Sequence, residues 1–413
     1  MNFHDNKSRK LKCDVKSLSR SIYNIYIKEN KGLGYFIMRN LFGTIISKEI
    51  SNRQRQSEID IAKGLAVFFM ILVHFCSTFL DTAYNGTIFD DVISFMGCVP
   101  AAPVFMFVMG VGFVYSKKQE PEKLFRRGLY IFFGGYILNF FRGVLPLLIG
   151  NKLGYYELPQ TTLPGYGYLF EVDILQFAGM AMIIVAFLKG VKISEVFYPF
   201  AAVFAAVISP YMWQIKTQQP ILDIILSPVL GGTEYTYHPV FSWIFYPLMG
   251  AFFGWLLIRV KDKNAFYATA SIVSVFILFI GLFYSYKHPE YDFGIVTGEV
   301  YNYFQHGILS NLIFVAAIIC WLALWNLLMP LIPQFIKKKL TFWSKATTPM
   351  YVIHWLYLSW CSFLVFDTFD IKQSILGIII LIISTEITAD LYIKIKDRLS
   401  EREEIDIPAI IEN

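Results

Sequence analysis

Apolar segments about as long as a bilayer is thick recur along this chain and are separated by short polar connections. A helix needs about 20 mostly apolar residues to cross the hydrocarbon core of a membrane, and each segment comes close to that length. The pattern predicts an all-α, polytopic membrane protein with about ten spanning helices. Their expected ranges are 58–81, 99–116, 124–149, 169–188, 195–213, 238–258, 265–285, 306–329, 346–366 and 373–395.

Charge alternates from one connection to the next. Connections after even-numbered segments are basic, whereas those after odd-numbered segments have few cations and hold several acids. Lysine and arginine accumulate in cytoplasmic loops, so we expect both termini to be cytoplasmic. The basic connections contain Lys117, Lys118, Lys123, Arg126, Arg127, Lys189, Lys192, Arg259, Lys261, Lys263, Lys337, Lys338, Lys339, Lys394, Lys396 and Arg398. The acidic ones contain Asp90, Asp91, Glu157, Asp223, Glu234, Glu290, Asp292, Asp367 and Asp370.

This pattern divides the chain into three regions. Residues 1–56 form a basic cytoplasmic arm, residues 57–396 a ten-helix membrane domain, and residues 397–413 a cytoplasmic tail. Within the arm, the apolar stretch 33–48 is too short and too interrupted to span comfortably. We therefore expect it to lie along the inner membrane surface.

The composition agrees with a membrane protein. Of the 413 residues, 56% are hydrophobic and 16% are charged, which is too apolar for a soluble protein of this size. The net charge of +5 arises in the basic segments and does not indicate a nucleic-acid partner. The five cysteines are scattered and odd in number, so they predict neither a disulfide framework nor a zinc site. No metal is expected, and no dinucleotide-binding or phosphate-binding loop is apparent.

The first spanning segment carries two ionisable residues, Lys63 and His74. They are eleven residues apart, which is about three helical turns, so both lie on one helix face roughly 16 Å apart along the axis. Ionisable groups in a spanning helix are costly unless they face protein or water, and by default they mark a functional site. The alternative is that Lys63 reaches the lipid headgroups and His74 is a hydrogen-bonded packing residue.

The sequence EIDIAKGLAVFFMILVHF around these two residues resembles the first helix of the membrane acyltransferases of the acyltransferase type 3 family. It also resembles the related group that includes heparan-α-glucosaminide N-acetyltransferase. The resemblance implies a ten-helix core, an acyl-CoA co-substrate, expected to be acetyl-CoA, and His74 as the catalytic group. Two departures stand out: Lys63 replaces a common Arg, and the loop 82–98 lacks the His that the heparan-related enzyme has there.

Two roles for His74 are open. It acts as a general base on an acceptor hydroxyl, or it accepts the acyl group itself and passes it on. Imidazole suits both roles because it titrates near neutrality. Resemblance to the type 3 family implies the first role and an extracytoplasmic sugar, polysaccharide or other envelope acceptor. Asp81 is a further candidate catalytic carboxylate, but it lies too far along the helix to contact His74, so Ser77, Thr78 or another helix would orient the ring.

Arg142 lies deeper in the third segment than contact with lipid headgroups readily explains. We expect it to pair with Glu171 or Asp173 in the sequence LFEVDILQFAGMA, which resembles the start of the fourth helix in the heparan-related group. The three residues would then line a cavity shared with His74, with the carboxylates as catalytic candidates and Arg142 as a substrate-binding candidate. A structural ion pair between helices is an equal alternative.

Three later features are less specific. His354, in a run from Tyr351 that resembles the family's late Tyr-x-x-His helix, is a second substrate-binding candidate. His238 opens the sixth segment, where an interfacial aromatic belt is the favoured interpretation. Glu386 and Asp390 lie one turn apart in the last segment and are expected to balance Lys63 or the arginines before the third segment.

The basic connection before the third segment is the candidate site for acyl-CoA. Lys123, Arg126 and Arg127 resemble the paired-Arg element that follows the second helix in the type 3 family. Together with Lys63 they have the charge needed to hold the phosphates of CoA from the cytoplasmic side. The alternative is that these charges only set the topology.

We therefore expect a multi-pass protein of the cell membrane, of bacterial plasma-membrane type, that transfers an acyl group from cytoplasmic acyl-CoA to a hydroxyl or amine. The expected partners are the lipid bilayer, acyl-CoA and an extracytoplasmic glycan or envelope acceptor, without nucleic acid and with a homodimer left open. The main alternative is a proton-coupled transporter or flippase of a small molecule or lipid-linked sugar. A catalytically inactive scaffold or sensor is the third.

Overall fold

The computed structural model describes residue 43 and residues 45–116, 120–155, 166–233, 235–288, 303–362 and 365–406. Over this part of the chain the protein is helical, and its only β structure is three isolated bridges. Eight of its helical stretches are long and apolar enough to cross a membrane. The all-α, polytopic architecture expected from the sequence is therefore confirmed.

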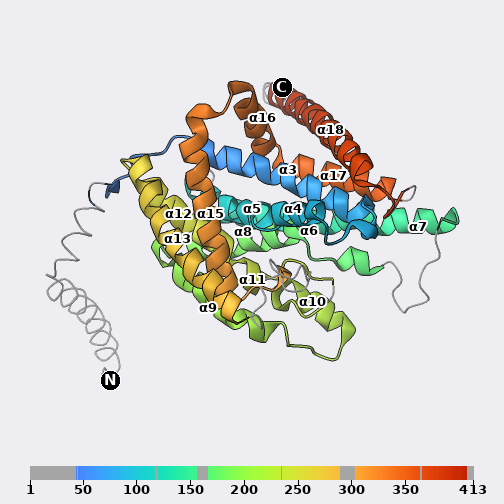
Figure 1. Cartoon of the computed structure of the whole chain (residues 1–413), viewed down its shortest axis with the longest axis horizontal. Coiled ribbons are helices and arrows are strands. Elements are labelled where there is room, and N and C mark those ends of the chain that lie inside the picture. Colours follow the sequence, from blue (N-terminus) through green and yellow to red (C-terminus); the bar gives the residue numbers. More distant parts are fainter. Residues whose placement is uncertain are drawn as a thin grey trace, which may run out of the picture.

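These eight stretches contain most of the helices drawn in Figure 1. They comprise α3 (Ser57–Phe79); α4 (Ile88–Gly97) with α5 (Ala102–Tyr115); α6 (Pro121–Asn139), η2 (Phe140–Val144) and α7 (Leu145–Lys152); η4 (Glu195–Phe197) with α9 (Tyr198–Met212); α11 (Val240–Trp243) with α12 (Phe245–Leu257); α13 (Lys263–Lys287); α15 (Ile308–Leu328) with η5 (Met329–Leu331); and α18 (Ile371–Asp406).

Two of the ten expected spans are shorter helices. α8 (Ile174–Gly190) has 17 residues, and α17 (Thr347–Cys361), which follows α16 (Gln334–Lys345), has 15. α8 begins later than the apolar pattern indicates because Asp173 caps it, and the chain just before it is bridged to the segment after α10 (Pro220–Leu230). α10 is itself a short apolar helix in a stretch where the sequence predicts only a connection. The cytoplasmic placement of the termini stays a prediction.

Helix α3 lies at the centre of the bundle. In Figure 1 it runs between α17 and α18 on one side and α4 and α5 on the other, and it also packs against α15 and α16. Apolar residues on different sides of it, including Ala62, Val67 and Ile71, are fully buried. A helix that is apolar all round belongs in a core. The ionisable residues of α3 are consequently surrounded by protein.

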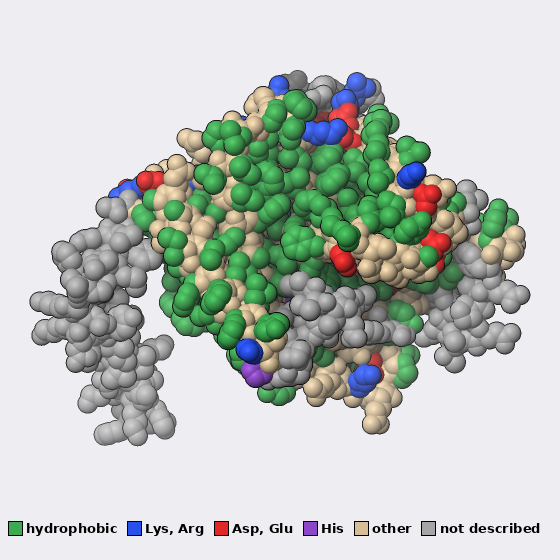
Figure 2. Space-filling model, in the orientation of Figure 1, with side chains coloured by type: hydrophobic (Ala, Val, Ile, Leu, Met, Phe, Trp, Pro, Cys, Tyr) green, Lys and Arg blue, Asp and Glu red, His purple; other side chains and the backbone are tan. Residues whose placement is uncertain are grey.

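The peripheral helices turn apolar side chains outward. On α13, Ile272, Phe276 and Phe279 are 72%, 64% and 70% exposed. Figure 2 shows hydrophobic side chains over most of one face, with charged side chains mainly near its margins. An apolar surface of this extent is unusual in a water-soluble monomer and suits contact with lipid tails.

The expected N-terminal arm lies mostly outside the described residues, as does most of the stretch 33–48. Its described end, residues 45–52, runs beside the end of α12. There the backbone N–H of Ser47 donates to the carbonyl of Arg259 at 2.7 Å, and that of Asn52 donates to the carbonyl of Ile258 at 2.9 Å. The chain is thus held to the bundle just before it enters α3.

Glycine allows α5 and α12 to pack with their backbones in close contact. A Cβ added at Gly250 would lie 1.9 Å from the carbonyl oxygen of Phe107, and one added at Gly110 would lie 2.1 Å from that of Pro247. Small residues at helix interfaces permit such close approach in membrane proteins. Because both obstacles are backbone atoms, no rotamer change relieves them.

We expect Gly250→Ala to lower the free energy of unfolding by about 1–3 kcal/mol, because the added methyl forces the two helices apart. Gly112→Ala in α5 is the control, since a Cβ there meets nothing within 4 Å. Thermal or denaturant unfolding in detergent micelles provides the measurement. Equal effects of the two substitutions would contradict this account of the α5–α12 contact.

Candidate active site

The start of α8 places two carboxylates inside the bundle. The Asp173 carboxylate accepts from the backbone N–H of Ile174 at 2.7 Å, and the Gln176 side chain accepts from the N–H of Asp173 at 3.2 Å. This capping box satisfies backbone groups that would otherwise lack partners at the helix end. Just upstream, the N–H of Val172 donates to the carbonyl of Tyr235 at 2.9 Å. These contacts fix the direction in which Glu171 and Asp173 project.

Arg142 joins both carboxylates. It lies in η2, a π-helical turn, and its guanidinium is 3.1 Å from a Glu171 oxygen and 2.9 Å from an Asp173 oxygen. Its Nε donates to the Asn139 side chain at 3.2 Å, and the guanidinium stacks over the ring of Trp355 at 4.5 Å. The pairing expected from the sequence is therefore confirmed, and it involves both candidate carboxylates. One cation between two carboxylates leaves this cluster with a formal charge of −1.

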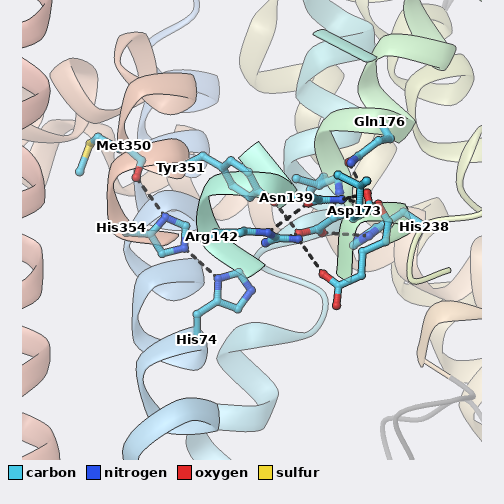
Figure 3. A network of polar contacts seen from close by, with 12 residues as sticks. His74, Asn139, Arg142, Asp173, Gln176, His238, Met350, Tyr351 and His354 are labelled. Carbon is cyan, nitrogen blue, oxygen red and sulfur yellow. Dashed lines mark hydrogen bonds and ion pairs between the residues drawn. The ribbon is translucent and has the colours of Figure 1, made fainter. Parts of the chain in front are cut away.

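Two further residues complete the surroundings of Asp173 (Figure 3). The Tyr351 hydroxyl donates to Asp173 at 2.5 Å, and Nδ1 of His238 lies 3.4 Å from the other carboxylate oxygen. His238 is only 5% exposed and packs against the Trp243 ring at 4.4 Å. The interpretation of His238 as part of an interfacial aromatic belt is therefore wrong, because its ring is enclosed by protein beside a carboxylate. Local sequence does not signal this, since the partners come from three separate helices and loops.

His74 contacts a second histidine rather than a residue of its own helix. Its Nδ1 lies 2.9 Å from Nε2 of His354, whose Nδ1 donates to the carbonyl of Met350 at 3.0 Å. The hydroxyls of Ser77 and Thr78 donate to the backbone carbonyl of His74. Of the groups considered for orienting the His74 ring, it is therefore another helix, α17, that does so.

Asp81 has a different surrounding from the one expected of a catalytic carboxylate. It caps the turn Thr82–Tyr84, where it accepts from the N–H of Ala83 at 2.8 Å. Its backbone N–H donates to the carbonyl of Phe369 at 3.0 Å. The structure thus places Asp81 at the end of α3 and shows no contact between it and the His74 ring.

Several of the candidate residues line two neighbouring cavities. The first, of about 310 Å³, is lined by Lys63, Lys123 and Arg127 and is called here the basic cavity. The second, of about 330 Å³, is lined by His74, Asp173 and His238 and is called the imidazole cavity. Four residues line both: Met70, Phe105, Ile174 and Tyr351. The cavities therefore adjoin through a shared wall between α3, α5, α8 and α17.

The cations of the basic cavity are not equivalent. Within the described part of the chain, Lys63 and Arg127 have no carboxylate partner, whereas Lys123 pairs with Glu120 at 2.8 Å. Arg126 pairs with Glu122 at 2.7 Å and does not line the cavity. The first turn of α17, at Thr347 and Thr348, lines the cavity beside these cations. Unpaired cations and a helix N-terminus together favour an anionic ligand.

Glu386 and Asp390 do not balance these cations. Glu386 pairs with Lys339 at 3.0 Å, and Asp390 pairs with Lys394 at 2.6 Å on its own helix. The expectation that they compensate Lys63 or the arginines of the basic connection is therefore wrong. Lys339 of α16 and Lys394 of α18 satisfy them, so they do not offset the positive charge of the basic cavity.

Metal ligation receives no specific support from this geometry. Among the residues that the structure describes, no group of three or more His, Cys, Asp and Glu side chains is arranged to hold a metal ion. The polar groups that line the imidazole cavity include two imidazoles, two phenols and a carboxylate held by an arginine. They are suited to proton transfer on a bound substrate.

The structure thus defines a polytopic helical membrane protein with a buried imidazole site beside a cationic cavity. The family model described as "Heparan-alpha-glucosaminide N-acetyltransferase, catalytic" matches residues 55–282. The match covers more than half of the 413-residue chain. The chain belongs to this family of membrane acetyltransferases. No curated protein matches the sequence.

Removing the central cation tests the role of the ion cluster. We expect Arg142→Met to lower the free energy of unfolding by about 3–5 kcal/mol, because Glu171 and Asp173 are left buried without a partner. Lys339→Met breaks a more exposed pair with Glu386 and should cost less than about 1 kcal/mol. Both are measured by unfolding in micelles. Similar losses in the two variants would show that the buried cluster does not support the bundle.

Proposed function

We propose that this protein transfers a short acyl group, with acetyl as the expected form, from acyl-CoA to a hydroxyl or amine of a glycan or other envelope acceptor. The observation that carries the proposal is the shared wall of the two cavities. A donor held by the cations of one cavity has its reactive end beside the imidazole of the other.

Lys63 and Arg127 are the proposed phosphate contacts. Both are cations without a carboxylate partner in the described residues, and both line the basic cavity. Charge-assisted contacts to phosphate are among the stronger hydrogen bonds in proteins. From Lys63, helix α3 covers roughly 16 Å to reach His74. The flexible pantetheine arm of CoA can follow that path and bring the thioester into the imidazole cavity.

His74 is the proposed general base. It takes a proton from the acceptor hydroxyl or amine as that group attacks the thioester carbonyl. A carbon–oxygen or carbon–nitrogen bond forms, the carbon–sulfur bond breaks, and the departing thiolate receives the proton from the imidazolium. The proton count is balanced, and His74 returns to its starting state. His238 and Asp173 line the same cavity and are available to contact the acceptor.

Sidedness follows from the charge pattern of the connections. The basic cavity lies by the positively charged start of α6, which the distribution of cations predicts to be cytoplasmic. The donor therefore enters from the cytoplasm, and the acceptor approaches the imidazole cavity from the opposite side. Under this proposal the protein spans a plasma membrane and modifies a molecule outside it.

The two adjacent arginines give a matched test of donor binding. We expect Arg127→Ala to weaken CoA binding about tenfold to a hundredfold, which corresponds to the loss of a charged hydrogen bond of about 1.5–3 kcal/mol. Arg126→Ala should change the affinity less than about twofold, because Arg126 pairs with Glu122 outside the cavity. Titration calorimetry with CoA on the purified protein measures both. An affinity for CoA that is unchanged in both variants would mean that these charges only set topology.

Removal of the imidazole tests the catalytic step. We expect His74→Ala to lower the transfer rate by about a hundredfold or more, as is usual when a general base is lost, with CoA affinity unchanged. Release of free CoA is followed with amine-bearing and hydroxyl-bearing glycans as acceptors. Normal turnover in His74→Ala would remove this residue from its role. Acceptor-independent proton flux in liposomes would instead support a transporter.

A further inference from the structure

We propose that His354 is a positioning residue that holds His74 in the tautomer whose Nε2 is unprotonated. The inference rests on the proposed role of His74 as a base. It assigns His354 a different role from the substrate contact expected from the sequence, because His354 is completely buried and lines neither cavity. His354 can therefore influence a bound substrate only through His74.

The contact between His354 and the Met350 carbonyl determines which nitrogen of the His354 ring is protonated. Its Nδ1 lies 3.0 Å from the carbonyl oxygen of Met350, and a carbonyl oxygen only accepts hydrogen bonds, so Nδ1 carries a hydrogen. A second proton on Nε2 would make a fully buried cation with no carboxylate among its described contacts. Arg142, which stacks on the adjacent Trp355, would add repulsion. The His354 ring is therefore neutral, and its Nε2 holds a lone pair.

The protonation of His354 in turn determines which nitrogen of His74 is protonated. Nε2 of His354 lies 2.9 Å from Nδ1 of His74, and a hydrogen bond at that distance needs one proton between the two nitrogens. Because His354 Nε2 is the acceptor, His74 Nδ1 must be the donor. A neutral His74 then has its only other ring nitrogen, Nε2, free to accept a proton. Which nitrogen of a histidine is protonated is commonly set by the hydrogen bond that the other makes.

The residues around the His74 ring fix its orientation. His74 lies with its centroid 4.4 Å from that of Trp355, and it forms part of the wall of the imidazole cavity. Figure 3 shows the Met350 carbonyl, His354 and His74 as a continuous chain of contacts. A histidine side chain without such a partner favours the tautomer protonated at Nε2. In that tautomer Nε2 already carries a hydrogen, so it cannot receive the proton of the acceptor.

The tautomer can be read directly from nitrogen chemical shifts. The chain has six histidines, so signals in protein labelled with ¹⁵N in the histidine rings can be assigned by single substitutions. In the full-length protein in lipid nanodiscs we expect His74 to show a protonated Nδ1 and an unprotonated Nε2. In His354→Phe the His74 signals should move to those of an Nε2-protonated ring. His306→Phe removes a buried imidazole paired with Tyr246 instead and should leave His74 unchanged.

Measurements of kcat and KM distinguish a positioning role of His354 from a merely structural one. We expect His354→Phe to lower kcat about tenfold to a hundredfold while KM for acyl-CoA changes less than about twofold, since donor binding does not involve this residue. His354→Gln, which can offer an acceptor oxygen to His74 Nδ1, should recover a large part of kcat and of the tautomer signal. A thermal unfolding midpoint close to that of the unchanged protein confirms that each variant is folded.

Two outcomes would overturn the inference: a His74 that is protonated at Nε2 in the unchanged protein, or a glutamine variant as inactive as the phenylalanine variant. The nitrogen spectrum does not depend on any transferase activity. A protein with the expected tautomer but without acyl transfer would refute the proposed function and leave the role of His354 intact. Activity that persists with the opposite tautomer would refute only the role of His354.

Discussion

The burial of one cation between two carboxylates is the constraint on which the polar interior depends. Arg142, Glu171 and Asp173 have side chains that are only 6%, 13% and 14% exposed, so all three are largely shielded from water. Burying ions this deeply is unfavourable unless they are paired and hydrogen-bonded. The cluster meets that requirement with partners from the end of α6, the start of α8 and helix α17. Misplacing any of these elements would remove an ion pair or a hydrogen bond from a buried charge.

The ion cluster and the histidine pair meet at α17. Tyr351 donates to Asp173, and His354, one helical turn later, contacts His74. Trp355 lies between them, with the Arg142 guanidinium at 4.5 Å and the His74 ring at 4.4 Å. A shift of α17 would thus alter both networks together. The family match ends at residue 282, before α17, although this helix supplies the groups that contact His74 and Asp173.

The separation of charge between the cavities suits a reaction with an anionic donor. Cations concentrate in the basic cavity, whereas the cluster beside the imidazole cavity has a formal charge of −1. Under the proposed function, this distribution of charge attracts the phosphates of the donor to the basic cavity and disfavours their entry into the imidazole cavity. Mostly apolar residues form the wall shared by the two cavities, including Met70, Phe105 and Ile174. The phosphates and the reacting atoms can therefore occupy environments of different polarity.

By itself, the sequence determined the all-helical membrane class, the Lys63 and His74 face of the first span, and the expectation that Arg142 pairs with Glu171 or Asp173; the structure showed that it pairs with both. Those features depend on local periodicity and on the cost of burying charge, both of which can be read from one chain. Only the tertiary structure decided that His354 contacts His74, that His238 lies beside Asp173, and that Arg127 rather than Arg126 lines the basic cavity. These contacts join residues up to 280 positions apart, or depend on which way a side chain points from its helix. Helical periodicity specifies the face of one helix but not the partner that packs against it.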